Sequence, residues 1–335
     1  MTIRIALVGA GLAARSHALD IITDPTMELT GVTARSAASA RAFTAIFGGT
    51  IYPDVEAIVD DDRVNAVVVA VPPSAVLGVT EQLDINKPCL VEKPIVTTDS
   101  ERDRLSNLAQ RFTHLIAPFN RRYQPHIRQA ANMIESGLIG NVVDVNAQWR
   151  GPYRSRFAND GGTYRGSAGP RHGVLVDTGS HALDLISMLV GYTHPIHVLG
   201  GLTCNDRGAD IAAELEIAAG TTIRLTVTDD PNAPECGGWA VVVNGAAGSL
   251  TVDSRGSQVR TTSSGTLQGF RAEPMHRPVS DLARMADGIA PLGSPMAEVL
   301  TVSDVIIAAH DHNQQRRARW KRPRGKALGR LNGAC

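Results

Sequence analysis

The 335-residue sequence is poor in cysteine, in lysine and in long apolar runs. Its four cysteines are far apart and form no Cys-x-x-Cys pair, which argues against a zinc site or a disulfide framework and favours a reducing compartment. The longest apolar run, Ala66 to Val71, ends at Pro72-Pro73 and is far too short to span a bilayer. Met1 leads directly into an apolar strand pattern and not into a signal peptide, so we expect a cytoplasmic protein without a membrane partner.

No charge of one sign predominates, because 33 Lys and Arg residues face 33 Asp and Glu residues. This balance gives no reason to expect nucleic acid or a charged membrane as a partner. The cations are nevertheless uneven, since eight of them and no acid lie close to the C-terminus. We interpret residues 321–335 as a basic tail, solvated or lying on a neighbouring subunit, in preference to a nucleic-acid arm. The eight are Arg316, Arg317, Arg319, Lys321, Arg322, Arg324, Lys326 and Arg330.

The remaining composition is that of an ordinary globular protein, with 43% hydrophobic and 20% charged residues. The chain is long for a single core, so two domains are expected. A change of pattern near residue 121 divides it into residues 1–120 and 121–320, followed by the basic tail.

The first 120 residues alternate short apolar runs with amphipathic stretches. The runs lack internal alternation and are separated by helical segments, which indicates a parallel sheet covered on both faces. We therefore predict a doubly wound α/β domain. Strands are expected at residues 3–8, 29–33, 66–71, 89–91 and 115–117, and helices from near residues 12, 37, 75 and 100.

The second part begins with a helix and continues with alternating strand patterns. Glycine-rich turns separate these strands, as is typical of an antiparallel or mixed sheet. We predict an α/β domain with an open, largely antiparallel sheet, through which a homodimer or homotetramer would form. Helices are expected at residues 124–136, 178–190 and 296–315, and strands at 141–150, 196–202, 212–218, 221–228, 239–244 and 249–252, with a polar loop at 151–173.

A glycine-rich turn follows the first strand and opens a helix. Its sequence is Gly9-Ala10-Gly11-Leu12-Ala13-Ala14, a G-x-G-x-x-A pattern. Gly9 permits the tight turn, Gly11 lets a pyrophosphate approach the backbone, and Ala14 permits close packing of helix on strand. The free amides of the first helical turn face the phosphates. In this context the motif predicts a dinucleotide site, and a glycine turn without a ligand is the weaker alternative.

The residues after the second strand bear on the choice of dinucleotide. Val32-Thr33-Ala34-Arg35-Ser36 carries no carboxylate for a ribose 2′-hydroxyl. Arg35 and Ser36 could instead receive a 2′-phosphate, by charge and by a hydroxyl donor. This favours NADP over NAD. The alternative is that Arg35 stacks on the adenine or points to solvent, and that NAD binds as well.

Lys93 is one of only four lysines among the 33 basic residues and lies in Glu92-Lys93-Pro94 at the end of a strand. Lysine can be tuned to give and take a proton near neutral pH, whereas arginine cannot. The strand end lies at the carboxyl edge of the sheet, where ligands of open parallel sheets bind. Pro94 restricts the backbone of Lys93 and could form a cis bond. The alternative is a lysine that extends from a strand end to water.

Asp177-Thr178-Gly179-Ser180-His181 stands at the start of an amphipathic helix. Residues four apart share a helix face, so Asp177 and His181 can point together into a cleft. Gly179 leaves room for a ligand. Asp177 could also be only the N-cap of the helix, and His181 alone would more often be a structural histidine.

Together these segments resemble the Gfo/Idh/MocA oxidoreductase family, over nearly the whole chain. That resemblance implies a Rossmann domain, a second domain with an open sheet and a nicotinamide cofactor between them. It also implies that Lys93 is the acid/base residue, with Asp177 and His181 beside the reacting hydroxyl and Asn120 and Arg121 near cofactor or substrate. The matching segments are Gly9 to Ala14 with His17, Pro72-Pro73, Glu92-Lys93-Pro94, Asn120-Arg121-Arg122-Tyr123, Ile139-Gly140 and Asp177 to Asp184. Val71, Pro72, Pro73 and Glu92 are expected to line the cofactor.

The predicted reaction is the interconversion of a secondary hydroxyl and a ketone. Arginines and tyrosines in the loop from Arg150 to His172 suit a polyhydroxylated or anionic small molecule such as a sugar, an inositol, a nucleotide sugar or a glycosylated aminocyclitol. These arginines could equally pair with acids elsewhere or lie on a subunit interface. The predicted substrate residues are Lys93, Arg121, Tyr153, Tyr164, Arg165, His172, Asp177 and His181.

Two rival functions remain open. Some relatives use a transient redox step to cleave glycosidic bonds, and a nucleotide-sensing regulator would keep the glycine turn without the chemistry. The presence of Lys93, Asp177 and His181 together argues against the regulator. His310-Asp311-His312 is interpreted as helix surface and not as a metal site, because residues two apart do not share a helix face. No metal is predicted.

Overall fold

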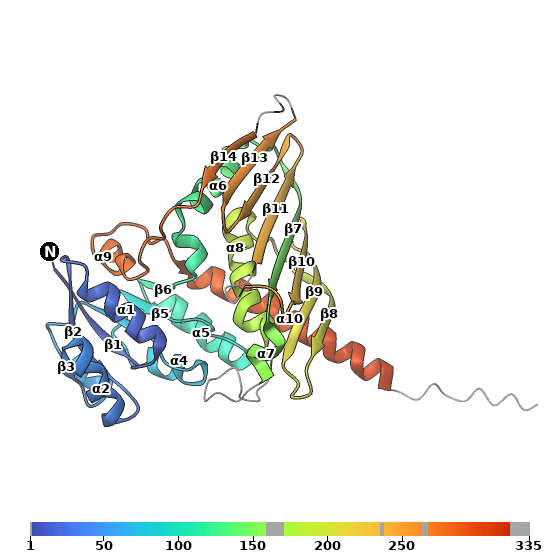
Figure 1. Cartoon of the computed structure of the whole chain (residues 1–335). Helices are drawn as coiled ribbons and strands as arrows, with labels where there is room; N and C mark the ends of the chain where they lie inside the picture. Colours follow the sequence, from blue (N-terminus) through green and yellow to red (C-terminus); the bar gives the residue numbers. More distant parts are fainter. Residues whose placement is uncertain (1, 159–170, 235–237, 263–264, 266, 322–335) are drawn as a thin grey trace, which may run out of the picture.

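A computed structural model describes residues 2–158, 171–234, 238–262, 265 and 267–321. The chain forms two sheets, each with its own helices, and the long C-terminal helix α10 runs between them (Figure 1). No helix in these described ranges is both long and apolar enough to cross a membrane.

The first sheet is parallel in six of its seven strands. Its order is β15-β6-β5-β4-β1-β2-β3, and only β15, which returns from the distant end of the chain, is antiparallel. The bounds of the five predicted strands differ from the expected ones by at most two residues. The short strands β3 and β15 were not predicted, because no apolar run marks them in the sequence. Their bounds are β1 Ile3–Val8, β2 Met27–Thr33, β3 Thr50–Ile51, β4 Ala66–Val69, β5 Cys89–Val91, β6 Leu115–Ala117 and β15 Ser294–Pro295.

Helices cover both faces of this sheet, which explains why its strands carry no polar alternation. Ile5 and Leu7 of β1 pack on the side of α1, whereas Ala6 and Val8 face the side of α5. The helices are α1 Leu12–Ile22, α2 Ala37–Phe47, α3 Glu56–Val59, α4 Pro73–Thr80, α5 Asp99–Arg111 and, from later in the chain, α9 Ser280–Ala286. The predicted doubly wound fold is confirmed.

The second sheet has eight strands in the order β14-β13-β12-β11-β7-β10-β9-β8. Every pairing is antiparallel except that of β7 with β10, so the predicted largely antiparallel sheet is confirmed. The prediction missed β13 and β14, because Gly-Ser-Gln-Val-Arg-Thr offers a single apolar side chain, Val259. The bounds are β7 Val142–Gly151, β8 His197–Cys204, β9 Asp210–Ala218, β10 Thr222–Asp229, β11 Gly238–Gly245, β12 Gly248–Asp253, β13 Gly256–Thr261 and β14 Leu267–Arg271.

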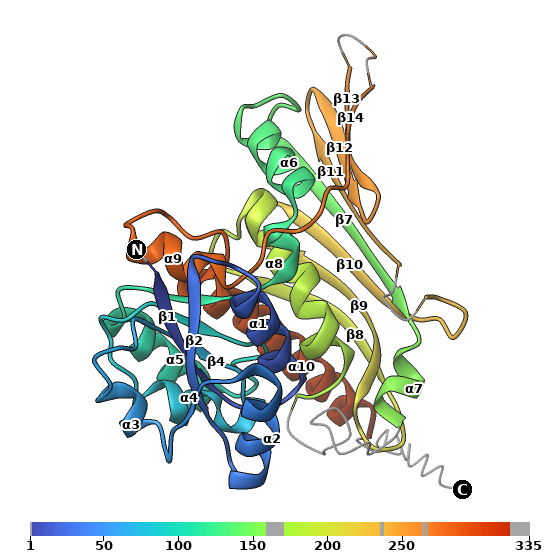
Figure 2. The same cartoon turned by 60° about the vertical axis from the view of Figure 1, so that its left-hand side comes forward.

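Helices lie on the face of this sheet that is turned toward the first domain (Figure 2). Side chains of β7, β10 and β11 on this face form a core with α6 and α8. Helix α10 joins the two halves, because Val302 and Val305 belong to this core while Val299 and Ile307 belong to a core of the first sheet. The remaining helices are the 3₁₀ turn η1 Asn120–Tyr123, α6 Pro125–Glu135, α7 Tyr153–Ala158, the π-helical turn η3 Leu175–Gly179, α8 Ser180–Val190 and α10 Met296–Lys321.

A buried ion-pair network ties η1, α8 and α10 together. The Nε of Arg122 donates to both carboxylate oxygens of Asp184 at 3.0 and 2.8 Å, and its Nη2 donates to Glu298. Asp184 is 0% exposed, and Ser187 donates a further hydrogen bond of 3.0 Å to Glu298. Burial raises the pKa of the Asp184 carboxyl, and Arg122 opposes that shift. The network holds the helix that carries His181 against the segment that carries Arg121.

Candidate active site

The glycine turn has the backbone geometry that close ligand approach requires. Gly9 has φ of 115°, and a Cβ on it would lie 2.2 Å from the carbonyl oxygen of Ala70, so only glycine fits. A Cβ on Gly11 would meet open space, and α1 has no side-chain N-cap hydrogen bond. Ala14 is 0% exposed against the sheet, while Leu12 and Ala13 face outward. The first amides of α1 are therefore available to a phosphate group.

Arg35 and Ser36 follow β2 at the same edge, and both are exposed. The hydroxyl of Ser36 caps α2 by accepting the amide of Ser39 at 3.2 Å, and the two hydroxyls lie 2.8 Å apart. The hydroxyl of Ser36 therefore has a structural role besides the predicted one. Arg35 presents its side chain to solvent at this edge.

Residues after β4 lie against the glycine turn. The amide of Ala70 donates to the carbonyl of Val8 at 2.8 Å, so this segment continues β4 beyond its last paired residue. Val71 lies 3.4 Å from a Cβ placed on Gly9, and Pro72 and Pro73 start α4. The proline pair thus begins the helix beside the predicted phosphate site.

Lys93 lies just beyond β5, and its ammonium group reaches the second domain. Its Nζ donates to the backbone carbonyl of Asp177 at 3.0 Å and lies 3.6 Å from the Oδ1 of the same residue. The side chains are 15% and 3% exposed, so the contact is largely shielded from water. The Lys93–Pro94 peptide bond is cis. The alternative of a lysine extended to solvent is wrong for this structure.

Glu92 links the same strand end to the helix of the glycine turn. Its Oε1 lies 2.8 Å from the Nε2 of His17 in α1, and its amide donates to the carbonyl of Val69 at 2.9 Å. His17 is 5% exposed. The pair therefore fixes α1 relative to the peptide that carries Lys93.

Asp177 is not a helix N-cap, contrary to the alternative drawn from the sequence. It lies inside η3, whose first residue is Leu175, and its amide donates to the carbonyl of Gly173 at 3.0 Å. The helix begins earlier than residue 178 because another residue, Asp210, receives the amide of Leu175. His181 follows in the first turn of α8, and its ring meets that of Phe119 edge to face at 5.5 Å.

Arg121 reaches an aromatic surface of the second sheet. Its guanidinium lies 4.9 Å from the ring centroid of Trp239, which stacks on Trp149 at 5.3 Å. The neighbouring Asn120 has a buried Oδ1 without a hydrogen-bond partner among the described residues. A buried amide oxygen without a partner, at the same edge of the sheet as the glycine turn, suits a bound polar cofactor or substrate. Trp239 was missed because it reads in the sequence as an ordinary strand residue.

Arg156, an arginine of the predicted loop, lies beside Asp177, which receives the ammonium group of Lys93. Its Nη1 lies 3.9 Å from the Oδ2 of Asp177 and 3.3 Å from the hydroxyl of Thr178. The guanidinium also lies 5.4 Å from the ring centroid of Tyr153, whose buried hydroxyl has no hydrogen-bond partner among the described residues. Burial raises the pKa of Tyr153 to about 12. Sequence reasoning covered Arg156 only as one of the arginines between Arg150 and His172 and could not single it out.

The predicted loop from residue 151 and the predicted surface position of His310 need correction. The loop from residue 151 begins with helix α7, because Tyr153 and Phe157 pack into the core one turn apart. Tyr164 and Arg165 lie outside the described residues. His172 is partly buried just before η3. His310 is not on the helix surface as predicted, since it is 9% exposed and faces Asp210.

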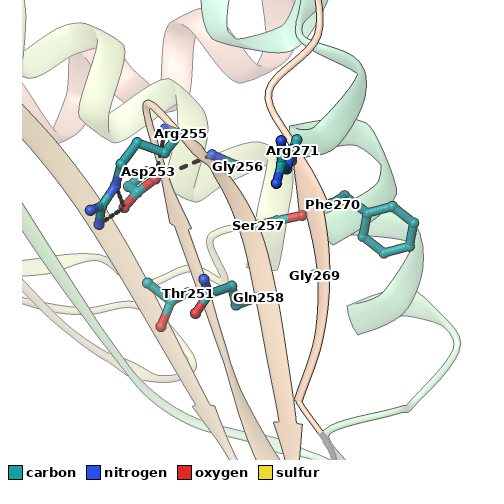
Figure 3. A pocket seen from close by; sticks show the side chains of 9 residues that line it. All are labelled: Thr251, Asp253, Arg255, Gly256, Ser257, Gln258, Gly269, Phe270 and Arg271. Atoms are coloured by element: carbon teal, nitrogen blue, oxygen red, sulfur yellow. Dashed lines mark hydrogen bonds and ion pairs between the residues drawn. The ribbon is translucent and has the colours of Figure 1, made fainter.

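A separate hollow of about 310 Å³ lies on the second sheet across β12, β13 and β14 (Figure 3). The carboxylate of Asp253 within it accepts the side chain and amide of Arg255 and the amide of Gly256. This hollow lies at the β14 edge of the sheet, opposite the β8 edge against which α10 packs. Its lining is Thr251, Asp253, Arg255, Gly256, Ser257, Gln258, Gly269, Phe270 and Arg271.

Comparisons with known proteins identify relatives of both halves. Residues 3–117 match the model of the GFO_IDH_MocA oxidoreductase family with its NAD-binding Rossmann fold, and residues 127–251 match the GFO/IDH/MocA C-terminal domain. A dTDP-3,4-didehydro-2,6-dideoxy-alpha-D-glucose 3-reductase of Streptomyces violaceoruber is 30% identical over 258 residues, covering 75% of this chain and 72% of the relative. An inositol 2-dehydrogenase of Rhizobium meliloti is 30% identical over 45% of this chain and 46% of its own.

Solved structures share the fold across both halves. GenD2 from gentamicin A biosynthesis, solved with NAD, superimposes with a TM-score of 0.73 at 22% identity, covering 94% of this chain and 95% of its own. A 3-ketoreductase mutant from Actinomadura kijaniata, solved with TDP-benzene and NADP, gives 0.69 at 20% identity, with coverages of 93% and 98%. At these identities the likeness shows the fold alone.

Proposed function

The chain belongs to the Gfo/Idh/MocA family of NAD(P)-binding oxidoreductases, and we propose that it interconverts a secondary hydroxyl and a ketone on a sugar-type substrate, with Lys93 as the acid/base residue. The observation that carries this proposal is the contact between Lys93 and Asp177 at the carboxyl edge of the first sheet, 3.0 Å to the carbonyl and 3.6 Å to Oδ1. This contact joins Lys93, the predicted proton carrier, to the second domain. It lies at the edge of the sheet where ligands of open parallel sheets bind.

The nicotinamide would supply or accept the hydride when bound. Gly9 and Gly11, with the first amides of α1, would hold its phosphates. Lys93 would take the proton from the substrate hydroxyl at Nζ, or return it to the ketone oxygen in the reverse direction. Asp177 orients that ammonium through two oxygens, and His181 would share the proton transfer from the next helical turn.

The proposed substrate is a small polyhydroxylated molecule, such as a sugar, an inositol, a nucleotide sugar or a glycosylated aminocyclitol. Arg121 over Trp239 and Arg156 beside Tyr153 give the second domain two cationic groups on aromatic surfaces. Such pairs suit sugar rings and anionic groups. The reductase of Streptomyces violaceoruber acts on a nucleotide sugar by its name, which supports this class. Assembly as a homodimer or homotetramer through the second sheet stays part of the proposal.

The test of the reaction is a panel of sugars, inositols, nucleotide sugars and aminocyclitol glycosides, each assayed by absorbance with NAD and with NADP. Net cofactor reduction or oxidation with one of them supports the proposal. Product formed by glycosidic cleavage without net cofactor reduction would instead identify the glycoside-cleaving alternative. Cofactor binding without turnover of any member would favour a regulator.

We further propose NADP over NAD as the cofactor, because Arg35 is an exposed cation after β2 and residues 32–36 at this strand end include no carboxylate. Replacing Arg35 by Asp should weaken NADP far more than NAD, since a carboxylate repels a 2′-phosphate and accepts a 2′-hydroxyl. Titration of both dinucleotides measures this. A parent protein that prefers NAD would overturn the cofactor proposal and leave the reaction proposal intact.

A further inference from the structure

Asp210 is a fully buried carboxyl outside the predicted catalytic set. It is the first residue of β9 and is 0% exposed. Its Oδ2 accepts the amide of Leu175 at 2.7 Å, at the N-terminal end of the helical segment that carries Asp177 and His181. A helix start needs acceptors for its free amides, and a carboxylate is among the best of these. Asp210 of β9 supplies this acceptor, because η3 has no side-chain hydrogen bond from its own N-cap residue.

The backbone before this helix is shaped around the same carboxyl. Gly173 has φ of 138°, and a Cβ on it would lie 2.3 Å from the Oδ1 of Asp210. Only glycine therefore fits at this position. The amide of Asp210 donates to the carbonyl of His172 at 3.3 Å, and Gly173 bridges to Asp210 in parallel register. Residues 172–175 thus wrap around one side chain.

His310 of α10 faces the other oxygen of this carboxyl. Its Nε2 lies 3.5 Å from the Oδ1 of Asp210, and neither atom has a hydrogen-bond partner among the described residues. Burial raises the pKa of Asp210 to about 7 and lowers that of His310 to about 4, so burial favours the neutral form of each. A protonated Asp210 can donate from Oδ1 to the imidazole nitrogen while Oδ2 still accepts Leu175.

Few other charges face the pair. Arg171 and His172, from the segment before η3, lower the pKa of His310, and Asp311 of α10 raises it. Arg171 is itself bound to Asp311 at 2.8 Å and to Asp99 of α5 at 3.0 Å. Its charge is therefore largely neutralised by its own partners, and Asp210 has no cation in direct contact among the described residues.

We propose that Asp210 is a positioning residue that holds Asp177 in place for the reaction. The connection runs from the carboxyl of Asp210 to the amide of Leu175, along the first three residues of η3, to the carbonyl of Asp177 that receives Lys93. The proposal rests on the proposed function, because positioning matters only where Asp177 and Lys93 react. A shift of the turn would move the acceptor of Lys93 even though Asp210 touches neither substrate nor cofactor.

The first test needs no substrate and measures amide hydrogen exchange in the full chain. Asp210→Ala should speed exchange of the amides at residues 174–178 by about tenfold or more, since the buried amide of Leu175 loses its acceptor. Asp210→Asn should restore protection, because its amide oxygen can accept Leu175 and its NH₂ can donate to His310. Asp253→Asn is the matched control, because Asp253 is a carboxylate that also accepts backbone amides, in the hollow of Figure 3. It should leave amide exchange at residues 174–178 unchanged.

The second test uses whichever member of the substrate panel the parent protein turns over. Asp210→Ala should lower kcat by about tenfold or more while KM changes by less than about threefold, and Asp210→Asn should recover most of kcat. The proposal would be overturned if amide exchange in Asp210→Ala matched that of the parent, or if Asp210→Ala and Asp210→Asn lost kcat equally. Faster exchange with an unchanged kcat would also overturn it. Absence of turnover in the parent protein would refute the proposed function, and the exchange result would still decide whether Asp210 holds η3.

Discussion

Replacing Arg122 by Met should be among the most destabilising single changes in this protein. The substitution removes the cation between Asp184 and Glu298 and keeps much of the buried side-chain volume. Asp184 is 0% exposed, so its carboxylate would stay buried without its cation, whereas the Glu298 side chain is 35% exposed and can turn to water. Loss of one partner of a buried pair costs about 3–5 kcal/mol.

The hydrogen-bond geometry supports that magnitude. The Nε of Arg122 serves both Asp184 oxygens at 3.0 and 2.8 Å, and its Nη2 serves Glu298. Hydrogen bonds to charged groups contribute about 1.5–3 kcal/mol each, so two such interactions reach the same range. Asp184→Leu should cost a similar amount, because the Nε of Arg122 then loses both carboxylate oxygens that it serves.

Urea unfolding of the two single variants and of the double variant measures the coupling. Replacing a whole buried pair by apolar side chains is often nearly neutral, so Arg122→Met with Asp184→Leu should cost less than the two single changes added together, by about 2 kcal/mol or more. Single changes that each cost below about 1 kcal/mol, or a double variant whose cost is the simple sum, would refute the reasoning.

Two further predictions concern single side chains. Trp239→Leu should raise KM by about threefold to tenfold with little change in kcat, because it removes the ring below Arg121. Steady-state kinetics measure this, and an unchanged KM would contradict it. Asp210→Asn should gain stability relative to the parent as pH rises from about 4 to 7, by at most roughly 4 kcal/mol. The folded pKa of Asp210 is raised to about 7, so the parent carboxyl favours folding below its unfolded pKa of 3.8 and loses that contribution as pH rises through 7. Urea unfolding of both proteins at several pH values measures this, and a difference in unfolding free energy that stays constant from about pH 4 to 7 would disprove the shift.

Local sequence patterns were sufficient for five of the seven strands of the first sheet and for its glycine turn. The strands of this sheet are apolar on both faces, and Gly9 is required by a close approach of one backbone to another, so both features leave a direct trace in the residue types. The resemblance to a known family supplied the roles of Lys93, Asp177 and His181. Those roles stay predictions until turnover is measured.

The missed features depend on residues far apart in the chain. Asp210 lies 35 residues from Leu175, whose amide it receives, so the start of the helical segment that carries Asp177 cannot be read from the residues around it. Helix α7 was read as a loop because Tyr153-Arg154-Ser155-Arg156 looks polar, although Tyr153 packs into the core. In each case tertiary contacts decide the local structure.

The measurement that tests the central claim most directly compares Lys93→Ala with Lys87→Ala, using the substrate found in the panel. Lys87 also donates from Nζ to a carbonyl, that of Val59 at 3.2 Å, but lies at the opposite end of β5 and serves as the control. The account predicts that Lys93→Ala binds the dinucleotide as the parent does and loses turnover by about 10²- to 10⁴-fold, whereas Lys87→Ala keeps turnover. Turnover by Lys93→Ala at the parent rate would contradict the proposed role of Lys93 in proton transfer.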